Sequence, residues 1–253
     1  MKYCSPVTAM KIRYGPSMIK LGIDFGTSRI GLALQIEGVE IPLYSLDHAG
    51  YRKSLPDILQ EKRIETVVVG LPISMSGRYS ESTMRAVSFA EKVKTMFSGN
   101  VILVDETLTT ESARRMSSEI GIEFARVRDV FSAMQILRNE SSGKVVKWEV
   151  RNNRSICRNL PELPSGSKVL FFKPKSGLIE GIDSLEKMPG VFVEDPQVFL
   201  SFFRKGMKPV NLIDDIDFST YDIIVIACSE ELDGMVDLNS RGLQVIECSW
   251  LNG

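Results

Sequence analysis

The segment that follows Met18 constrains the fold most strongly, because short apolar runs alternate there with turn signals. Apolar residues dominate Lys20–Asp24, Ile30–Ile36 and Glu40–Leu46, and the pair Glu37-Gly38 separates the last two runs. Runs of this length joined by a glycine-containing pair are typical of strands connected by tight turns. We therefore predict that the chain opens with a three-stranded antiparallel meander.

The pattern then changes to helices that alternate with strands. Thr66–Gly70 is a continuous β-branched run, which is typical of a strand buried on both faces. The first half of the chain contains further signals of both kinds. They predict a strand at Val101–Val104 and helices over Ser54–Arg63, about Ala86–Phe97, Thr109–Glu119 and Asp129–Asn139. This order predicts an α/β fold with a mixed sheet and flanking helices.

The second half of the chain has its own set of signals. Residues 143–166 are basic and then rich in proline, which predicts a linker. Beyond it we expect a helix over Val198–Arg204 and strands at Val169–Phe172, Val191–Glu194, Pro209–Ile213, Ile223–Ala227 and Leu243–Glu247. Residues 167–253 are thus predicted to form a small α/β domain with parallel strands, and its role is open.

Charge is divided unevenly between the two halves. Residues 1–160 contain 23 Lys and Arg against 17 Asp and Glu, a net charge of +6, whereas residues 161–253 contain 8 against 15, a net charge of −7. This asymmetry predicts that the first half contacts a polyanion. The densest basic stretch runs from Arg138 to Arg158, and a solvated linker explains it about as well as a nucleic-acid contact does.

The ends and the cysteines bear on where the protein works. Residues 1–17 lack the apolar core of a secretory signal, so we interpret them as an N-terminal extension, and Met18 is an alternative start. No apolar run approaches the length needed to span a bilayer. The four cysteines, Cys4, Cys157, Cys228 and Cys248, show no metal-ligand spacing, and we expect free thiols in a reducing cytoplasm.

Few catalytic groups are available. His48 is the only histidine and lies in a polar stretch, where we expect an exposed surface residue. This weighs against catalysis by a histidine-activated nucleophile and against a histidine-rich zinc site. There is also no GxGxxG sequence and no phosphate loop of the Walker A type. Any chemistry must therefore come from carboxylates.

Carboxylates stand at the ends of three predicted elements. Asp24 ends the first strand, Asp105 and Glu106 end the Val101–Val104 strand, and Asp129 opens the last helix of the first half. Acids that converge at one sheet edge repel one another unless cations bind between them, and oxygen ligands suit Mg²⁺. The alternatives are a turn at Asp24, a loop at Asp105-Glu106 and a helix N-cap at Asp129.

Four ordered motifs resemble the YqgF/RuvX family over about residues 18–142. They are Ile23–Leu34 (IDFGTSRIGLAL), Val69–Gly77 (VGLPISMSG), Val104–Thr110 (VDETLTT) and Arg128–Leu137. Members of this family resemble Holliday junction resolvases and have an RNase H-type fold. They are associated with nuclease processing of the small-subunit ribosomal RNA precursor, so the resemblance implies an RNase H-like mixed sheet and a nucleic-acid substrate.

The resemblance also implies which residues form the site. Asp24, Glu106 and Asp129 match the acidic positions that bind Mg²⁺ or Mn²⁺, and Asp105 belongs to the same motif as Glu106. Since side chains alternate along a strand, Asp105 and Glu106 are expected to face opposite ways, and we favour Glu106 as the ligand. Thr107 departs from the family pattern, in which an arginine follows the Asp-Glu pair.

Candidate nucleic-acid contacts are Arg29, Arg78 and Thr27. Three functions remain open on this reading. The first is a metal-dependent nuclease that acts on structured RNA or branched DNA. The second is a nucleic-acid or ribosome-associated binding protein with little catalysis, which Thr107 favours. The third is an actin-like or sugar-kinase-type ATPase, since Asp-Phe-Gly-Thr also resembles a phosphate loop, but the second such loop is absent.

Overall fold

The structure of the protein is a computed structural model. The structure describes residues 18–106, 124–152, 155–158, 160, 162–227, 243–248 and 250–251. The predicted N-terminal extension, the predicted helix Thr109–Glu119, and Cys4 and Cys228 lie outside these residues.

The chain opens with the predicted meander. Its strands are β1 (Ile19–Phe25), β2 (Arg29–Ile36) and β3 (Val39–Asp47), and both pairs are antiparallel. Glu37 and Gly38 both have positive φ angles, of 51° and 79°, as a two-residue hairpin turn of type I′ requires. The meander therefore follows from turn chemistry that is visible in the sequence.

Three more strands extend this meander into a six-stranded sheet of order β3-β2-β1-β4-β5-β6. The added strands are β4 (Thr66–Leu71), β5 (Asn100–Asp105) and β6 (Lys147–Glu149). β4 is parallel to β1 and to β5, whereas β6 is antiparallel to β5. The sheet is therefore mixed, as predicted, and β1, β4 and β5 end at the same edge.

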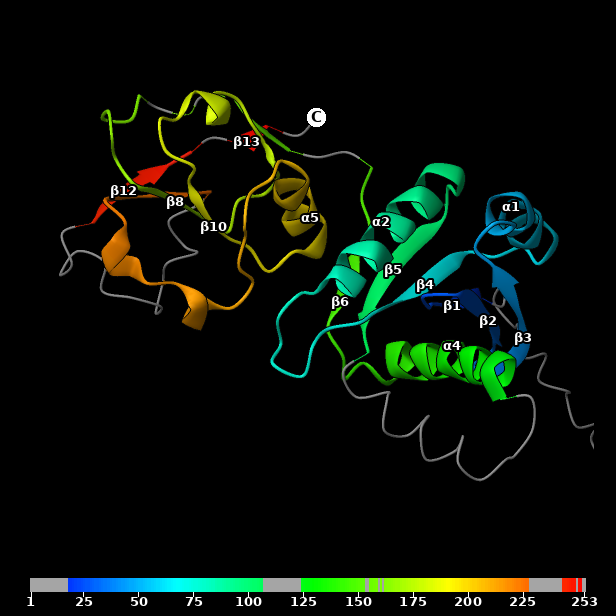
Figure 1. The fold of residues 1–253 in the computed structure, drawn as a ribbon. Coiled ribbons are helices and arrows are strands. Elements are labelled where there is room, and N and C mark those ends of the chain that lie inside the picture. Colours follow the sequence, from blue (N-terminus) through cyan, green and yellow to red (C-terminus); the bar gives the residue numbers. More distant parts are fainter. Residues whose placement is uncertain are drawn as a thin grey trace, which may run out of the picture.

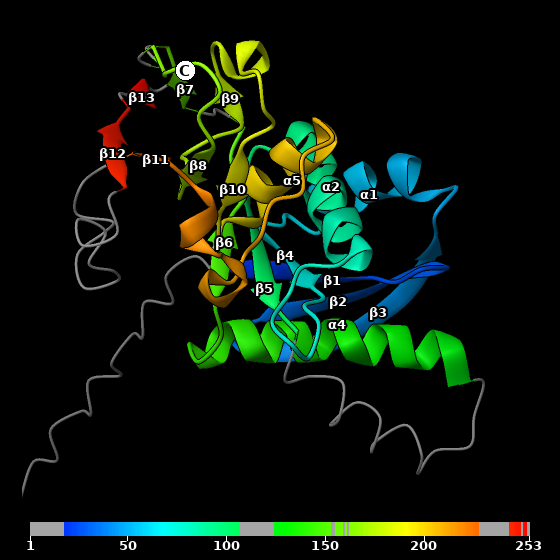
Figure 2. The ribbon, with the colours of Figure 1, turned by 60° about the vertical axis from the view of Figure 1, so that its left-hand side comes forward.

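Helices cover both faces of this sheet (Figure 1). α1 (Tyr51–Glu61) and α2 (Glu81–Met96) lie on one face, and α4 (Phe124–Ser142) lies on the other. Figure 2 shows α4 crossing beneath the strands. The prediction that Asp129 opens this helix is wrong, because α4 already begins at Phe124. Asp129 therefore lies inside the helix rather than at its N-cap.

The rest of the chain forms a second, four-stranded sheet of order β10-β8-β11-β12 in which all neighbours are parallel. Its strands are β8 (Val169–Phe172), β10 (Gly190–Phe192), β11 (Ile223–Ile226) and β12 (Gln244–Glu247), and α5 (Pro196–Arg204) follows β10. A small third sheet contains β7 (Ile156–Cys157), β9 (Leu178–Ile179) and β13 (Trp250–Leu251), and 3₁₀ turns lie at Ile182–Ser184, Ile213–Asp215 and Phe218–Thr220.

Two details differ from the sequence predictions. The predicted strand Pro209–Ile213 is not a strand: Val210 makes an isolated bridge to Phe192, and a 3₁₀ turn starts at Ile213. The segment predicted as a linker contributes β6 to the first sheet and β7 to the third. The domain boundaries themselves stay a prediction.

Cys157 and Cys248 form a disulfide, which contradicts the expectation of free thiols for this pair. The two residues are 91 positions apart in the sequence, and the antiparallel pairing of β13 with β7 brings the two segments together. A pairing created by such long-range contacts has no local spacing signature.

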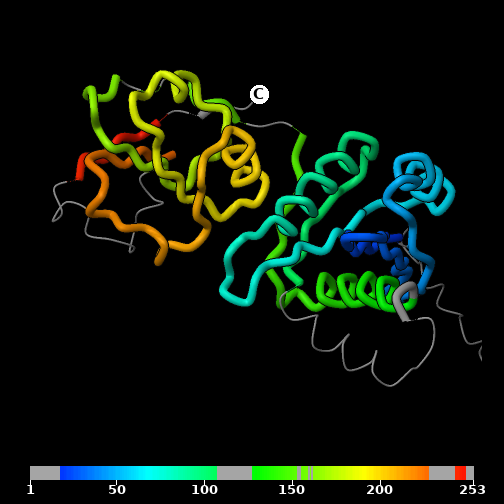
Figure 3. Tube along the Cα trace, in the orientation of Figure 1, coloured from blue at the N-terminus to red at the C-terminus, as the bar shows by residue number. Residues whose placement is uncertain are grey.

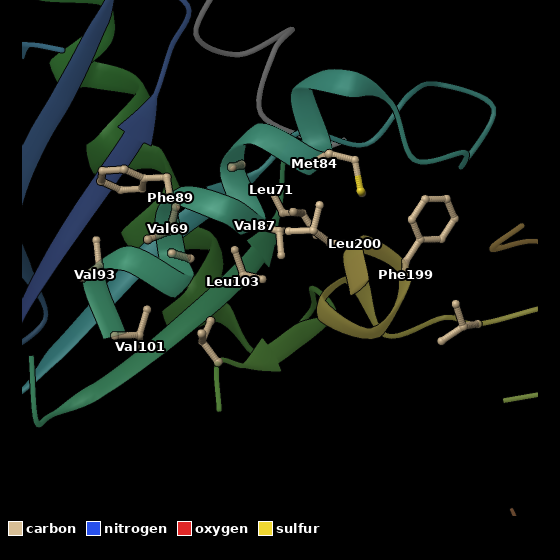
Figure 4. Packing of buried hydrophobic residues seen from close by; sticks show 14 of the residues in the cluster. Val69, Leu71, Met84, Val87, Phe89, Val93, Val101, Leu103, Phe199 and Leu200 are labelled. Atoms are coloured by element: carbon tan, nitrogen blue, oxygen red, sulfur yellow. The ribbon is translucent and has the colours of Figure 1, made fainter. Parts of the chain in front are cut away.

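The two halves of the chain share a hydrophobic cluster. Met84 and Val87 of α2 pack in the same cluster as Phe199 and Leu200 of α5 (Figure 4). The tube in Figure 3 shows these two helices side by side at the junction. Arg204 adds an ion pair to Glu91, with 2.7 Å between Nη1 and Oε2. None of the helices within the described residues is both long and apolar enough to cross a membrane.

Candidate active site

Two of the predicted acids meet at the carboxyl edge of the parallel strands. Asp24 lies near the end of β1, and Glu106 follows β5 directly, with β4 between the two strands. The backbone N–H of Glu106 donates a hydrogen bond to the carbonyl of Leu71, 3.1 Å away, at the end of β4. Parallel register thus brings together two side chains that lie more than 80 residues apart in the sequence.

A glycine in the middle strand makes room for the Glu106 carboxylate. A Cβ atom built on Gly70 would lie 1.4 Å from Glu106 Oε1 and 2.6 Å from Ile136 Cδ1 of α4. Any larger residue at this position would displace Glu106. The Glu106 carboxylate therefore lies over β4, on the face of the sheet that α4 covers. Asp24 interacts with residues of α4 on the same face.

Asp129 joins the site from α4, through a second close approach. A Cβ atom built on Gly31 of β2 would lie 1.9 Å from the Asp129 carbonyl oxygen, so the helix backbone rests directly on the strand at this point. Asp129 is only 8% exposed. Its carboxylate is close enough to Asp24 to raise the pKa of that residue.

The closeness of the acids changes their pKa values. Burial and the negative charge of Asp129 raise the pKa of Asp24 to about 6, although a hydrogen bond from Ser132 and the charge of Arg128 oppose the shift. Burial and the charges of Asp24 and Asp105 raise the pKa of Glu106 to about 8. Like charges held together in a partly desolvated place disfavour ionisation.

Arg29, a predicted phosphate contact, is the partner of Asp129. Its Nε donates to Asp129 Oδ2 at 3.1 Å, and Arg128 Nε lies 3.7 Å from Asp129 Oδ1. The Arg128 side chain is 60% exposed. Arg128 and Ser132 were not predicted as site residues. The signal for Ser132 was its position three residues after Asp129, which places both on one helix face.

Asp105 acts on both faces of the sheet, since its charge contributes to the raised pKa of Glu106 and also reaches Tyr79. Its charge contributes to raising the pKa of the Tyr79 hydroxyl, after burial and the charges of Asp195 and Glu194. Tyr79 stands just before α2, whereas Glu106 lies on the α4 side of the sheet. This separation agrees with the alternation of side chains expected for a strand, and it favours Glu106 as the site residue.

The remaining predicted residues have different surroundings. Arg78 makes a bidentate ion pair with Asp215, with 2.9 Å from Nε to Oδ2 and 2.5 Å from Nη2 to Oδ1. Thr27 is exposed in the turn between β1 and β2. His48 is half-buried rather than exposed, and its Nε2 lies 2.9 Å from the Gly26 carbonyl oxygen beside Thr27. Thr107 lies outside the described residues.

The donor set is chemically suited to a hard divalent cation. Within the described residues, no three acidic, histidine or cysteine side chains are already grouped around one point as metal ligands. Asp24 and Glu106 nevertheless form an adjacent pair of carboxylates whose charge disfavours ionisation, and Arg29 holds Asp129 next to them. Carboxylate oxygens are the ligands that Mg²⁺ and Mn²⁺ prefer, so the residues fit such an ion.

The first half of the chain therefore has the order and the acidic edge of an RNase H-like α/β domain. The sequence model of the family RuvX, described as Holliday junction resolvase, matches residues 18–140. The chain belongs to the YqgF/RuvX family through this N-terminal region. The predicted family resemblance is thereby confirmed.

Bacterial relatives match the same region. A protein of Ruminiclostridium cellulolyticum named "Putative pre-16S rRNA nuclease" is 36% identical over 129 residues, which are 47% of this chain and 89% of the relative. A protein of Shewanella oneidensis with the same name is 38% identical over 106 residues, covering 40% and 75%. Among solved structures, Thermus thermophilus RuvC in complex with a Holliday junction substrate matches with a TM-score of 0.33 and 15% identity, over 52% of this chain and 99% of that chain.

Proposed function

We propose that this protein is a metal-dependent nuclease that hydrolyses phosphodiester bonds in structured nucleic acid, with the ribosomal RNA precursor as its substrate. The observation that carries the proposal is the pair Asp24 and Glu106, whose pKa values are raised to about 6 and about 8 at the carboxyl edge of the sheet. A fold that places like charges together gains from a cation that neutralises them. Relatives with the name of a pre-16S rRNA nuclease support the choice of substrate.

Each residue of the site has a role in this proposal. Asp24 and Glu106 hold Mg²⁺ or Mn²⁺, and such ions activate water and stabilise the leaving oxygen in phosphodiester hydrolysis. Asp129 is the third ligand, available once Arg29 turns toward a substrate phosphate. Thr27 and Arg128 lie on the substrate side of the site and contact the backbone of the nucleic acid.

Partners and location follow from the same reasoning. The positive charge of residues 1–160 is suited to RNA or branched DNA, and a ribosomal precursor particle is the proposed setting. Part of the basic stretch is engaged elsewhere, since Arg138 pairs with Glu40, and Lys147 pairs with Glu140. A cytoplasmic location remains part of the proposal because of the proposed substrate, since the expectation of free thiols does not hold for Cys157 and Cys248.

A cleavage assay tests the proposal. The full chain is incubated with labelled precursor RNA and, separately, with a labelled four-way DNA junction, with Mg²⁺, with Mn²⁺ and with EDTA. Asp24→Asn removes one ligand charge and should lower the cleavage rate by at least about a hundredfold. Asp57→Asn is the matched control, because Asp57 is exposed on α1, which lies on the opposite face of the sheet from α4.

The outcomes separate the competing functions. Metal-dependent cleavage that Asp24→Asn removes and Asp57→Asn retains supports the nuclease. Binding of RNA with no cleavage under any metal condition supports the binding protein, for which Thr107 is the sequence argument. ATP hydrolysis without nucleic acid would support the ATPase. Cleavage that persists in EDTA would contradict a metal-dependent reaction.

A further inference from the structure

A cavity of about 580 Å³ opens between β3 and α4, outside the cluster of acids. Its apolar wall includes Val127 and Phe131 of α4, and Tyr44 of β3 lines it from the other side. Tyr44 is 48% exposed and Val127 is 40% exposed, although both are large apolar side chains. A cavity of this volume is typical of a site for a small organic ligand or one unit of a polymer.

A β-bulge shapes this cavity. β2 and β3 pair Gly31 with Ser45 but Ala33 with Pro42, so β3 contains one more residue than β2 between the two pairs. Leu43 and Tyr44 stand opposite a single residue of β2 at this point. β3 is an edge strand of the sheet. Bulges of this kind redirect side chains and are common beside active sites. The bulge therefore explains why consecutive residues of one strand, Tyr44 and Ser45, both line the cavity.

The cavity adjoins the acidic site through Arg29. This residue lines the cavity, and it also donates to the Asp129 carboxylate at 3.1 Å. A group bound in the cavity is thus one side chain away from the proposed metal ligands. A phosphate attached to that group would be able to draw Arg29 from Asp129, because Arg binds phosphate and carboxylate with the same donors.

We propose that this cavity receives one unpaired nucleobase of the substrate strand, stacked on Tyr44, with the adjoining phosphate at Arg29. The inference rests on the proposed function and adds to it that the residue next to the cut is single-stranded. An aromatic face beside an apolar wall suits the flat face of a base, and a cation at the rim suits the phosphate. A base that is paired in a duplex cannot enter such a cavity.

The polar groups of the cavity point to a preference among the bases. Asp47 and Ser45 line it together with Arg29. The Asp47 carboxylate accepts hydrogen bonds, so it favours bases that carry an exocyclic amino group. Adenine, cytosine and guanine have this group and uracil does not. The proposal therefore includes weaker binding of uracil than of cytosine, which has a ring of similar size.

Binding measurements on the full chain test the proposal. Fluorescence anisotropy with labelled 12-nucleotide oligocytidine, oligouridine and an RNA duplex, all in EDTA, reports affinity without cleavage. Tyr44→Ala should weaken binding to the single strands about tenfold and leave the duplex unchanged, because it removes one stacking surface. Tyr44→Phe should bind like the wild type. Asp47→Asn should remove most of the preference for oligocytidine over oligouridine.

A control and a salt series separate stacking from charge and from folding. Val39→Ala changes another exposed apolar residue of β3, 63% exposed and absent from the cavity wall, and should not alter affinity. Tyr44→Ala should keep the wild-type slope of affinity against salt, since no phosphate contact is lost. Equal affinity of wild type and Tyr44→Ala for single strands overturns the base site, as does an equal loss of affinity for the duplex.

The two proposals fail in different ways. If cleavage is metal-dependent and needs Asp24 while Tyr44→Ala binds single strands normally, the nuclease stands and the base site is wrong. If Tyr44→Ala lowers only the affinity for single strands while no metal supports cleavage, the base site is supported and the protein is a binding protein rather than a nuclease. A wild-type dimer in sedimentation that Tyr44→Ala dissociates, with unchanged RNA affinity, would assign this cavity to a second copy of the chain and overturn the base site.

Discussion

α4 buries a carboxylate against the sheet near each of its ends, and the surroundings of the two carboxylates differ. Glu140, near the C-terminal end, is 7% exposed and lies between two lysines, with 2.5 Å to Lys20 Nζ and 2.8 Å to Lys147 Nζ. Asp129, 8% exposed, also has a cationic partner, Arg29, at 3.1 Å, but its charge acts on a second acid and raises the pKa of Asp24. Near Glu140 two cations face one carboxylate, whereas near Asp129 several carboxylates lie close to one another.

The pKa values express this difference. Burial raises the pKa of Glu140, but hydrogen bonds from Lys147 and Lys20 outweigh it, so the pKa lies below the ordinary value. For Asp24 and Glu106 burial and neighbouring acids act in the same direction, and the pKa values rise. The ion pairs of Glu140 thus stabilise the fold. The raised pKa values of Asp24 and Glu106 mean that their ionisation destabilises the fold, and a bound cation would offset this loss.

The largest expected effect is a decline of stability with pH that comes from the acidic end alone. Well below pH 3.8 Asp24 is protonated in both states, and as the pH rises toward its native-state pKa of about 6 only the unfolded state ionises readily. The native state then holds more protons, so stability falls as pH rises, by on the order of 3 kcal/mol from Asp24. Glu106 extends the decline to about pH 8.

Urea unfolding of metal-free protein from pH 4 to pH 9 measures this decline. The double variant Asp24→Asn, Glu106→Gln should show a nearly flat profile over the same range. Mg²⁺ should stabilise the wild type more at pH 8 than at pH 5, because the ion competes with protons, and should not stabilise the double variant. Parallel pH profiles for the two proteins would show that the acids are not coupled as described.

The next largest effect belongs to the paired end. Glu140→Ala leaves Lys20 and Lys147 without their shared partner, and the Lys20 side chain is only 18% exposed. We expect a loss of about 2 kcal/mol in the free energy of unfolding at pH 7, less than for a fully buried pair because Lys147 is 34% exposed. Cleavage activity of the remaining folded protein should be unchanged.

Urea unfolding at pH 7 checks this expectation, with Glu61→Ala, at an exposed position of α1, as the control. Asp24→Asn belongs in the same series, because it removes a like charge and should leave stability equal or raise it by about 1 kcal/mol. If Glu140→Ala and Asp24→Asn destabilise the protein equally, the contrast between the two ends of α4 is wrong.

The same contrast shows what the sequence alone reveals. The strands of the meander, β4 and β8 were predictable because apolar runs and turn pairs are local signals. Asp24 and Glu106 were predicted as site residues because they stand at strand ends within recognisable motifs, whereas Asp129 was predicted from its motif and lies inside α4. Glu140 was not singled out, since its partner Lys20 lies 120 residues away in the sequence. Its importance depends on tertiary contacts that no local pattern carries.

Other differences have the same physical origin. β6 reads Lys-Trp-Glu and was predicted as linker, because a short polar edge strand lacks the apolar run that marks buried strands. The disulfide joins residues 91 positions apart, with no spacing signature. Arg29 and Arg78 were predicted as phosphate contacts, and their carboxylate partners, Asp129 and Asp215, lie 100 and 137 positions away.

The smallest expected effect concerns Arg78, whose ion pair contrasts with the one that Arg29 makes. Asp129 is buried, whereas Asp215 belongs to an exposed turn of the acidic half, where Asp214 adds to the negative charge beside Arg78. Exposed ion pairs contribute little to stability, so a phosphate can compete for Arg78. Asp215→Asn should therefore raise affinity for RNA about twofold to threefold at low salt, and Arg78→Ala should lower it.

Anisotropy in EDTA across a salt series measures both changes, with Asp183→Asn, in the 3₁₀ turn at Ile182–Ser184, as the control. The gain from Asp215→Asn should vanish at high salt and in the Arg78→Ala background, because it depends on that one cation. A gain that persists without Arg78 would mean that Asp215 repels the nucleic acid directly, and Arg78 would then be a structural residue that joins the two halves of the chain.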